Sequence, residues 1–570
     1  MKILSVYPWT HISSSALMVN GKLVSAAPEE RFTRRKWTTD FPINSANWCL
    51  KNSKLTWDDL DLIAIPWNPG LNISSASSRW DSNISWRGEM LSNIPSNILK
   101  ATKNYSPGTM SLSFDKTKIV YLNHHDCHAA SAIFVSPFNK CDYLTIDGHG
   151  EVETCLMGNF DGKKLNNFHS ISYPHSVGLL YGTFTDFLGF KPDNDEWKTM
   201  ALASFSRKEN LYDKKFLEIY KLNENGFELN LSYFDFYLFD RKPNFYNKKL
   251  EELFGKPRIK NEKITKRHHE IAGALQRTFE KIVFHLLKIT KRLGGKSNNV
   301  VLAGGAAMNC VFNGRLEKNR IYKNNFIPPW PDDLGVSIGA TFLANKNLKK
   351  VKKKSFENKS VYLGPKYSDK EIKSLLNRYG LKFQKIEKVS SYVADKISKG
   401  YLIGWFQDRM EFTHRALGNR SIIADPRNKN TQNIINKAVK YRESFRPFAP
   451  AVLGEKAHEI FDIKKGEKIE FMEKAIMVRN NWKKKIPAVT HTDGTARVQT
   501  VFENYNPKFY KLIKEFYKLT NVPVLVNTSF NLNGEPIVEN PSDAIRTFHT
   551  CGLDILVLGD YIIEKNREYE

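Results

Sequence analysis

The sequence predicts an α/β protein with at least two domains, the first of which contains a duplicated unit. The chain has 570 residues, whereas a single hydrophobic core stops growing at roughly 250–300 residues. A strand-and-turn pattern at the N-terminus recurs near residues 143–165, and a lysine-rich stretch at 346–361 then interrupts the apolar patterning. An apolar content of 41% with 12% aromatic residues is sufficient for packed cores, which excludes disordered and fibrous classes.

The first 32 residues predict three short antiparallel strands. Apolar runs ILSV, SSALMV and KLVSAA alternate with polar turns, and the last two runs are joined by Asn20-Gly21. Asn-Gly between apolar runs is a strong hairpin signal because both residues tolerate a positive φ. A second copy follows as YLTIDG, TCLMGNF and the turn Asp161-Gly162. Two such units are typical of the core shared by actin, Hsp70 and the sugar kinases, in which phosphates and metal bind between the halves.

The remaining elements are predicted from their patterning. Residues 69–116 are rich in Ser, Asn and Trp without a clear period, which indicates an insertion or lid, whereas residues 262–294 have the spacing of a long amphipathic helix. VVLAGGAAMNC at 300–310 predicts a buried strand followed by glycines that let the backbone approach a ligand, although an ordinary strand-to-helix turn has the same pattern. We therefore expect a first domain at 1–345, a basic linker at 346–361 and a second domain at 362–570.

Composition narrows the class of ligand and the compartment. The formal net charge of +26 attracts anions such as nucleotides, acyl phosphates, acidic glycans or nucleic acid. No nucleic-acid-binding module accompanies the lysine runs, so we expect a solvated basic surface and no nucleic-acid partner. The N-terminus is too polar for a secretory signal, no window has the length of a membrane span, and the six scattered cysteines suit free buried thiols. A cytoplasmic location is expected.

A histidine pair suggests a metal site. In NHHDCHAASA, His124 and His128 are four residues apart, so both imidazoles face one side of a helix, although such pairs are as often surface or capping residues. Asp147 in the TIDG turn and Asp333 in PPWPDDLG are candidates for the remaining ligands. Imidazole and carboxylate ligands suit iron, manganese or zinc, with open positions for phosphate oxygens.

A second cluster is basic. Residues 407–453 contain few acids and many cationic side chains, namely Arg409, Arg415, Arg420, Arg427, Lys440, Arg442 and Arg446. Because guanidinium binds phosphate and carboxylate through a planar fork, this density predicts a polyanion pocket, with a solvated basic face as the alternative. Arg497 suits the same pocket, and so do four polar residues that could hold a small amide-like or carbonyl substrate, Asn527, Thr528, Ser529 and Asn531; a polar hairpin turn is the alternative for these four.

Together these segments resemble the NodU/CmcH carbamoyltransferase family almost from end to end. Nine motifs occur in the family's order: EERFTRRKW, HHDCHAASA, TIDGHGE, WKTMALA, LAGGAAMNC, RMEFTHRALGNRSIIADPR, FRPFAPAVL, DGTARVQTV and NTSFNLNGEPIV. The resemblance implies a duplicated actin-like (ASKHA) domain similar to threonylcarbamoyl-transfer proteins, followed by a YrdC-like α/β domain.

The resemblance also implies an activity. Such an O-carbamoyltransferase makes carbamoyl adenylate from carbamoyl phosphate and ATP and transfers the carbamoyl group to an acceptor hydroxyl of a sugar or natural product. ATP, carbamoyl phosphate as co-substrate and a divalent metal, Fe(II), are implied, with Mg accompanying ATP. The expected partner is a small-molecule acceptor, and a homodimer is left open.

Residue roles follow from the same resemblance. His11 matches a histidine suited to deprotonating the acceptor hydroxyl. The nucleotide is expected at Lys36, Lys198, Gly305 and Asn309; the metal at His124, His128 and Asp333, with Asp147 beside the metal or nucleotide; and carbamoyl activation at Arg415, Lys440, Arg446, Arg497, Asn527 and Ser529.

Two other functions remain compatible with parts of the sequence. An ATP-dependent sugar kinase would explain the duplicated core and the glycine-rich strand but leaves the arginine-rich segment unexplained. A tRNA-modification or nucleic-acid-binding protein would explain the positive charge. No motif identifies the acceptor.

Overall fold

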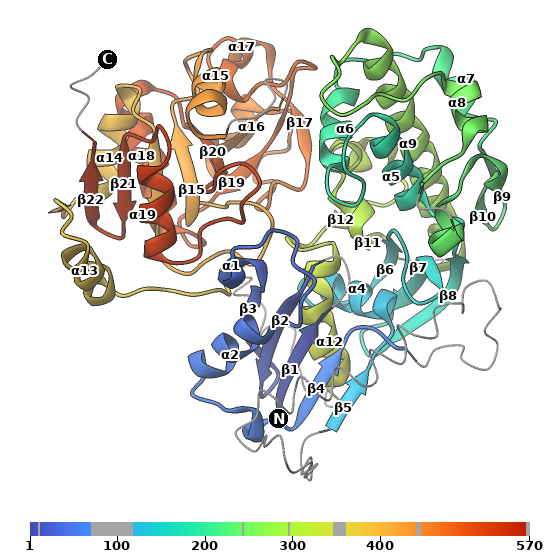
Figure 1. Ribbon diagram of the computed structural model, residues 1–570, viewed down its shortest axis with the longest axis horizontal. Coiled ribbons are helices and arrows are strands. Elements are labelled where there is room, and N and C mark those ends of the chain that lie inside the picture. The colour runs from blue at the N-terminus through green and yellow to red at the C-terminus, as the bar shows by residue number, and fades with distance from the viewer. Residues whose placement is uncertain are drawn as a thin grey trace. The chain divides into compact units, whose positions relative to one another are not determined.

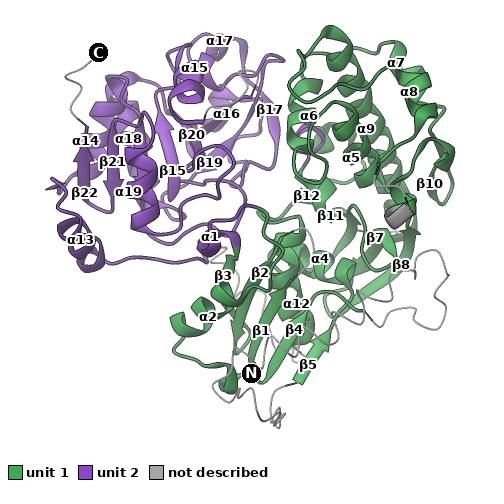
Figure 2. Ribbon diagram, viewed as in Figure 1, with its two compact units in different colours: residues 1–29, 37–308, 315–359 green, residues 30–36, 309–314, 360–570 purple. Residues whose placement is uncertain are grey.

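The computed structural model describes residues 1–8, 12–69, 118–241, 244–294, 297–345, 361–440 and 446–565. The chain forms two compact units (Figures 1 and 2). The N-terminal unit comprises residues 1–29, 37–308 and 315–359, and the C-terminal unit comprises residues 30–36, 309–314 and 360–570. Two short segments from the first part of the chain therefore belong to the C-terminal unit.

The N-terminal unit contains two five-stranded sheets of identical design. The first has the order β3-β2-β1-β4-β5 and the second β8-β7-β6-β11-β12. Their strands are β1 (Lys2–Tyr7), β2 (Ser14–Val19), β3 (Lys22–Pro28), β4 (Leu62–Ile65), β5 (Lys118–Tyr121), β6 (Cys141–Ile146), β7 (Glu153–Phe160), β8 (Leu165–Ser172), β11 (Asn299–Ala303) and β12 (Asn324–Phe326). In each sheet three antiparallel strands are followed by two parallel ones. The predicted duplication of an α/β core is confirmed.

The predicted turns form where the sequence places them. Asn20 and Gly21 join β2 to β3 with φ values of 49° and 77°, the left-handed conformations that a tight hairpin turn requires. Gly162, between β7 and β8, has a φ of 95°. Each sheet therefore begins as the antiparallel meander expected from the two copies of the pattern.

Two helices occupy the space between the sheets. Helix α12 (Val336–Ala344) packs on β1, β2 and β4 of the first sheet, and α4 (His124–Ile133) packs on β6, β7 and β11 of the second. The two helices also pack on each other, where a Cβ on Gly339 would lie 1.8 Å from the Cys127 carbonyl oxygen. Only glycine allows this close approach.

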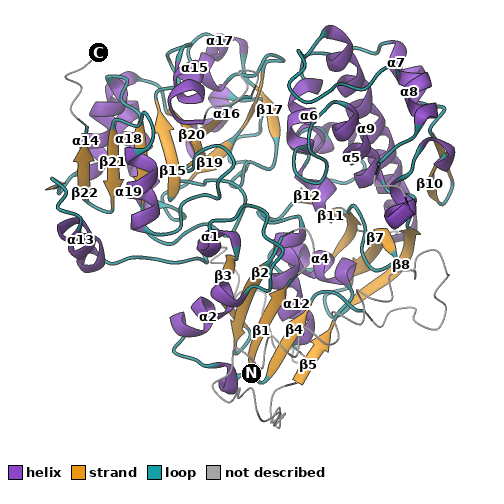
Figure 3. Cartoon of the chain, in the orientation of Figure 1, coloured by secondary structure: helices purple, strands orange, loops and turns teal. Residues whose placement is uncertain are grey.

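Further helices cover the outer faces of these sheets (Figure 3). Helix α2 (Ile43–Asn52) packs on β2 and β3, and α9 (Lys266–Gly294), which confirms the predicted amphipathic helix, packs on β6 and β7. Helices α5 (Val177–Phe187), α6 (Glu196–Ala203), α7 (Leu211–Phe216) and α8 (Lys248–Phe254) follow the second meander. The hairpin of β9 (Tyr220–Asn223) and β10 (Gly226–Leu229) separates α7 from α8.

The C-terminal unit is built on an eight-stranded mixed sheet of order β13-β22-β21-β14-β15-β20-β16-β19. Its strands are β13 (Gln384–Lys385), β14 (Ile403–Phe406), β15 (Arg420–Ala424), β16 (Ala449–Leu453), β19 (Gln499–Val501), β20 (Val524–Ser529), β21 (Ile555–Leu558) and β22 (Tyr561–Glu564). Helices α14 (Val389–Ser398), α18 (Pro507–Thr520) and α19 (Pro541–His549) pack around it, and α13 (Asp369–Arg378) packs against α19. The pair β17 (Ala475–Met477) and β18 (Thr495–Arg497) forms a separate ribbon. Trp405 lies fully buried in the core.

Other expectations concern cysteines and membranes. All six cysteines are buried free thiols, as predicted. Among the residues that the structure describes, no helix combines the length and apolar character needed to cross a bilayer. The proposed insertion at 69–116 and linker at 346–361 lie almost entirely outside the described residues.

Candidate functional site

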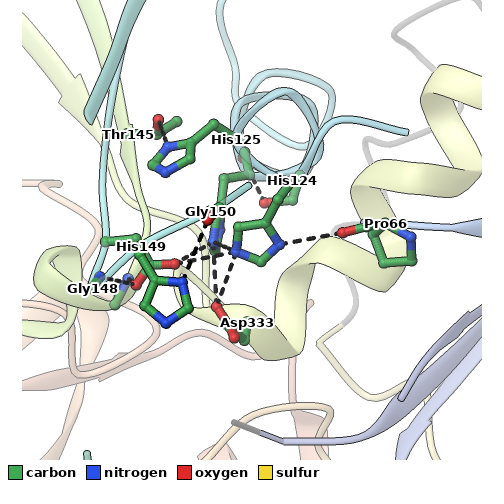
Figure 4. A network of polar contacts seen from close by, with 12 residues as sticks. Pro66, His124, His125, Thr145, Gly148, His149, Gly150 and Asp333 are labelled. Atoms are coloured by element: carbon green, nitrogen blue, oxygen red, sulfur yellow. Dashed lines mark hydrogen bonds and ion pairs between the residues drawn. The ribbon is translucent and has the colours of Figure 1, made fainter. Parts of the chain in front are cut away.

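Four side chains of the N-terminal unit bring their donor atoms to one point (Figure 4). His124, His128, Asp147 and Asp333 each offer one atom, and these atoms all lie within 4.8 Å of one another. The two Nε2 atoms are 3.1 Å apart, and Asp147 Oδ2 lies 3.3 Å from His124 Nε2 and 2.8 Å from His128 Nε2. Asp333 Oδ1 lies 3.4 Å from each Nε2 atom. The structure therefore brings together both predicted histidines and both candidate carboxylates.

Local structure explains this convergence. Asn123 caps α4 by accepting a hydrogen bond from the backbone N–H of Asp126, which places His124 in the first turn and His128 one turn later on the same face. Asp147 follows β6, and Asp333 begins the short turn that leads into α12. Donors from the end of a strand and from two helix starts thus meet at one point.

The donor set fits a divalent transition metal. Ligand atoms bound to one ion at roughly 2.0–2.2 Å lie about 3 Å apart, and the separations given above are close to that value. Two imidazole nitrogens and two carboxylate oxygens suit iron, manganese or zinc, and a four-atom set leaves positions for further oxygen ligands on an octahedral ion.

Hydrogen bonds outside the donor set orient it. Pro66 O lies 3.2 Å from His124 Nδ1, and because a carbonyl only accepts, this contact leaves Nε2 facing the other donors. Tyr7, at the end of β1, donates from its hydroxyl to Asp333 Oδ2 over 2.8 Å. Glu151 accepts from the backbone N–H of His124 over 3.0 Å and of Asn68 over 2.6 Å. The sequence prediction missed Tyr7 and Glu151, for which no spacing signal exists.

The electrostatics of the site favour a cation. Burial acts to lower the pKa of His124, but the carboxylates of Asp333 and Asp147 outweigh burial and raise it well above its usual value. Burial acts to raise the pKa of Asp147, but hydrogen bonds from both histidines hold it well below its usual range. Two ionised carboxylates in a buried site therefore need positive charge, which protons on the histidines or a bound metal can supply.

The glycine-rich turn after β11 contributes directly to this site. Gly305 N–H donates to Asp147 Oδ1 over 3.1 Å, and Gly304, with a φ of 89°, approaches the Ile146 carbonyl so closely that a Cβ would lie 2.1 Å from its oxygen. Because β6 and β11 are parallel neighbours, their carboxyl ends share one edge of the sheet. Gly305, predicted to contact nucleotide, thus also orients a candidate metal ligand.

A second candidate site lies in the C-terminal unit, where Arg497 and Arg415 are electrostatic neighbours. Burial and then the positive charge of Arg415 lower the pKa of Arg497 to about 10. Two like charges held together in a half-buried position are costly unless an anion offsets them. The pair therefore supports the predicted anion pocket.

Asn527 contacts the loop that carries Arg415 and presents an unused acceptor. Its Nδ2 donates to the carbonyl of Ala416, the residue after Arg415, over 3.0 Å and to Gln499 Oε1 over 2.8 Å. Gln499 is held in that orientation because its own Nε2 donates to Leu417 O over 2.9 Å. Asn527 is 1% exposed, and its Oδ1 accepts no hydrogen bond from any part of the chain that the structure describes. Because buried oxygens normally accept a hydrogen bond, this carbonyl oxygen still needs an N–H or O–H donor.

Lys440 is held by the end of β20 and by the residues that follow it. Its ammonium donates to Asn531 Oδ1 over 2.7 Å, to Asn531 O over 2.8 Å and to Ser529 O over 2.5 Å. Asn531, which the sequence suggests as a pocket residue or as part of a polar turn, holds the ammonium with two oxygens. Lys440 and Ser529, both predicted for this pocket, are thereby brought together.

Three arginines of the basic cluster stabilise the fold instead. Arg420 is fully buried, lies 3.7 Å from the Phe406 ring centroid and donates to the carbonyl of Pro365. Arg409 donates to Leu363 O over 2.6 Å, and Arg427 pairs with Asp425 at 2.6 Å. Arginine density in the sequence therefore overstated the number of pocket residues.

The other predicted residues are placed as follows. His11 lies outside the described residues, Lys36 is exposed in segment 30–36, and Asn309 caps the short helix α10 (Cys310–Asn313) in the C-terminal unit. Lys198, on α6, forms an ion pair with Asp195 at 2.8 Å. Arg446 is 5% exposed, and its carbonyl accepts a hydrogen bond from Gln432 Nε2.

Comparison with known proteins connects both units to one family. Residues 2–342 match the family model described as carbamoyltransferase N-terminus, and residues 394–565 match the one described as carbamoyltransferase C-terminus. Nodulation protein NolNO of Sinorhizobium fredii is 34% identical over 97% of this chain and 79% of its own length. Nodulation protein NolO of Bradyrhizobium diazoefficiens is 36% identical over 78% of this chain and 79% of its own length. An uncharacterized Synechocystis protein, sll1178, is 35% identical over 99% of this chain and 97% of its own length.

Two solved structures are similar to this chain at lower sequence identity. The activator of 2-hydroxyisocaproyl-CoA dehydratase from Clostridium difficile covers 62% of this chain and 98% of its own, with 16% identity and a TM-score of 0.33. HypF in its phosphate- and nucleotide-bound form matches 61% of this chain over 56% of its own length, with 15% identity and a TM-score of 0.31. Both TM-scores are low, so the strand order described above, and not this likeness, defines the fold.

Proposed function

The chain belongs to the carbamoyltransferase family, and from that premise we propose that it makes carbamoyl adenylate and transfers the carbamoyl group to an acceptor hydroxyl. Water would hydrolyse carbamoyl phosphate to carbamate and phosphate, and a carbamate oxygen would then attack the α-phosphorus of ATP and release pyrophosphate. The acceptor hydroxyl would then attack the carbamoyl carbon, and AMP would leave. We propose a sugar or another natural product as the acceptor.

We place the activation steps in the C-terminal unit, which we propose is YrdC-like. Arg415, Arg446 and Arg497 would offset the charge of carbamoyl phosphate and ATP. Lys440, held by Ser529 and Asn531, would fix the strand end that carries Ser529. A reactive mixed anhydride formed there must be kept from water until the acceptor reacts.

We place the transfer step in the N-terminal unit. His11 would remove the proton from the acceptor hydroxyl. His124, His128, Asp147 and Asp333 would hold a divalent ion, Fe(II) in our proposal, which supplies Lewis-acid polarisation of phosphate or carbonyl oxygens. Gly305 would keep Asp147 in place through its N–H. Lys198 would contact the nucleotide in this unit, whereas Lys36 and Asn309, which belong to the C-terminal unit, would contact it there.

The observation that carries the proposal is that Asn527 Oδ1 has no hydrogen-bond partner among the described residues. Phosphate and ATP offer oxygen acceptors to the arginines, whereas the carbamoyl group also has an amino group that must donate. A buried acceptor on the side chain that bonds to the loop of Arg415, together with the neighbouring charges of Arg415 and Arg497, matches both requirements of carbamoyl phosphate. Acetyl phosphate has nearly the same shape but carries a methyl group in place of the amino group.

This difference gives the test. Pyrophosphate release from ATP is measured with carbamoyl phosphate and with acetyl phosphate. The wild-type protein is expected to prefer carbamoyl phosphate by at least about 100-fold in kcat/KM, because a site built to bind N–H rejects an analogue that lacks it. Asn527→Ala is expected to lose most of that preference.

The matched control is Thr528→Val, which changes the neighbouring residue on the opposite face of β20. It should keep the wild-type preference. Release of ADP in place of AMP, or an unchanged preference in Asn527→Ala, would contradict the proposed chemistry.

A further inference from the structure

The segment 30–36 follows β3 of the N-terminal unit directly, yet it belongs to the compact C-terminal unit (Figure 2). Its first four residues form the short helix α1 (Glu30–Thr33). Two arginines of this segment, Arg31 and Arg34, contact two different loops of the C-terminal unit. Both loops carry residues of the candidate anion pocket.

Arg31 contacts the loop that carries Arg415. Its side chain is 1% exposed, and its guanidinium donates to Thr413 O over 2.7 Å while its Nε pairs with Glu30 at 3.3 Å. The same loop is also held by Glu411, whose carboxylate accepts from the backbone N–H of Leu417 over 2.8 Å. The backbone before and after Arg415 is therefore held by charged groups.

Arg34 contacts the loop that follows β20. Its two terminal nitrogens donate to Ile537 O over 2.6 Å and to Pro536 O over 2.7 Å, and its Nε lies 3.5 Å from Asp543 Oδ2. Its own backbone is left-handed, with a φ of 59°. A non-glycine residue keeps this conformation only where its surroundings determine it strongly, and this planar fork on two adjacent carbonyls does so.

The loop held by Arg34 connects to the pocket through a short series of hydrogen bonds. Glu535 O, one residue before Pro536, accepts from Asn531 Nδ2 over 2.7 Å. Asn531 Oδ1 in turn accepts from Lys440 Nζ, which also donates to Ser529 O. A shift of residues 535–537 would therefore move the group that orients Lys440.

We propose that Arg34, assisted by Arg31, is a positioning residue of the carbamoyl-activating pocket, so that a segment of the first repeat completes the site in the C-terminal unit. This inference rests on the proposed function of that pocket. Neither arginine needs to touch substrate. Arg34 acts through the loop at 531–537, and Arg31 through the loop at 411–417.

The test uses the full chain with Arg34→Ala, Arg34→Lys and, as a matched control, Arg35→Ala at the exposed neighbouring position. KM and kcat for carbamoyl phosphate are measured by pyrophosphate release, and hydrogen–deuterium exchange is followed over residues 529–538. Arg34→Ala is expected to lower kcat/KM about 10–100-fold, mainly through KM, and to raise exchange in that loop. Partial unfolding alone would lower kcat and leave KM unchanged.

Arg34→Lys keeps the charge but not the planar fork, so an intermediate KM is expected. If Arg34→Ala does not fold, KM and exchange in Arg34→Lys test the inference. Wild-type KM and wild-type exchange in both Arg34 variants would overturn the inference. Absence of carbamoyl-phosphate-dependent pyrophosphate release in the wild-type protein would refute the proposed function instead, and the exchange measurement would still show whether Arg34 holds the loop.

Discussion

The hydroxyl of Tyr7 limits how Asp333 can bind a cation. It donates to Oδ2, so Oδ1 is the oxygen that faces the two histidines. A carboxylate held in this way binds through one oxygen and leaves room for further ligands. The ring of Tyr7 also stacks on His124, with centroids 5.7 Å apart. Tyr7 thus orients two members of the candidate metal site.

Tyr7→Phe keeps the ring and removes only this hydrogen bond. We expect the affinity for Fe(II), measured by competition with a chromogenic chelator, to fall about 10-fold, the lower end of the effect of losing a partner of a ligand. Tyr181→Phe is the control, because its buried hydroxyl bonds to Gln276 instead. Equal metal affinity in the wild-type protein and Tyr7→Phe would contradict this role.

Sequence spacing could predict some of these residues but not others. His124 and His128 are four residues apart on one helix, so their common direction follows from helical geometry alone. Tyr7 and Asp333 are 326 positions apart, and Arg34 and Ile537 are 503 apart. Such contacts depend on tertiary packing, which leaves no local pattern. Only the chemistry of a buried carboxylate indicates that some donor must exist.

The elements themselves were more predictable than their packing. Asn20-Gly21 and the recurring pattern predicted the three-stranded meander that begins each five-stranded sheet, because turn chemistry is local. The basic segment after residue 407 was interpreted less accurately. An arginine that donates to backbone carbonyls, such as Arg420, cannot be distinguished in the sequence from an arginine that binds phosphate. Burial distinguishes the two, and burial of a single arginine is not encoded in spacing.

Asp142 shows how the packing of two elements introduces a dependence on pH. It lies on β6, where a Cβ on Gly294 at the end of α9 would come within 2.8 Å of its carboxylate. Burial raises the pKa of Asp142 to about 6, although a hydrogen bond from Tyr322 opposes this rise. The folded chain therefore keeps a proton that the unfolded chain releases near pH ~4.

This shift predicts the sign of a stability change. Protonated Asp142 favours the folded state, so its contribution is most favourable below pH ~4 and is lost as the pH rises to about 6. Asp142→Asn should raise the free energy of unfolding at pH ~7.5 by roughly 1–3 kcal/mol and change it little at pH ~4. Calorimetry at the two pH values measures the difference. Asp161→Asn removes an exposed acid whose pKa is lowered by backbone hydrogen bonds, so it should lower the free energy of unfolding at pH ~7.5. A higher free energy of unfolding at both pH values in Asp142→Asn would refute the assignment.

The two compact units each contain one candidate site made from their own residues. The four metal donors belong to the N-terminal unit, whereas Arg415, Arg446, Arg497 and Asn527 belong to the C-terminal unit. Segments 30–36 and 309–314 pass from the first part of the chain into the C-terminal unit. No local pattern assigns these short segments, because their membership depends on contacts such as Asn313 Nδ2 to Glu473 O.

This separation of sites predicts separable half-reactions. Arg446→Ala should abolish carbamoyl-phosphate-dependent pyrophosphate release, because the buried guanidinium is in the unit that we propose forms the adenylate. His11→Ala, and wild-type protein treated with an Fe(II)-selective chelator in excess Mg, should both retain that release within about 3-fold, since a change at the other site removes no interaction from this one. Metal content and thermal stability, measured on the same samples, show whether Arg446→Ala is folded and contains its metal ion. Equal loss of pyrophosphate release in Arg446→Ala and His11→Ala would mean that one site performs both steps.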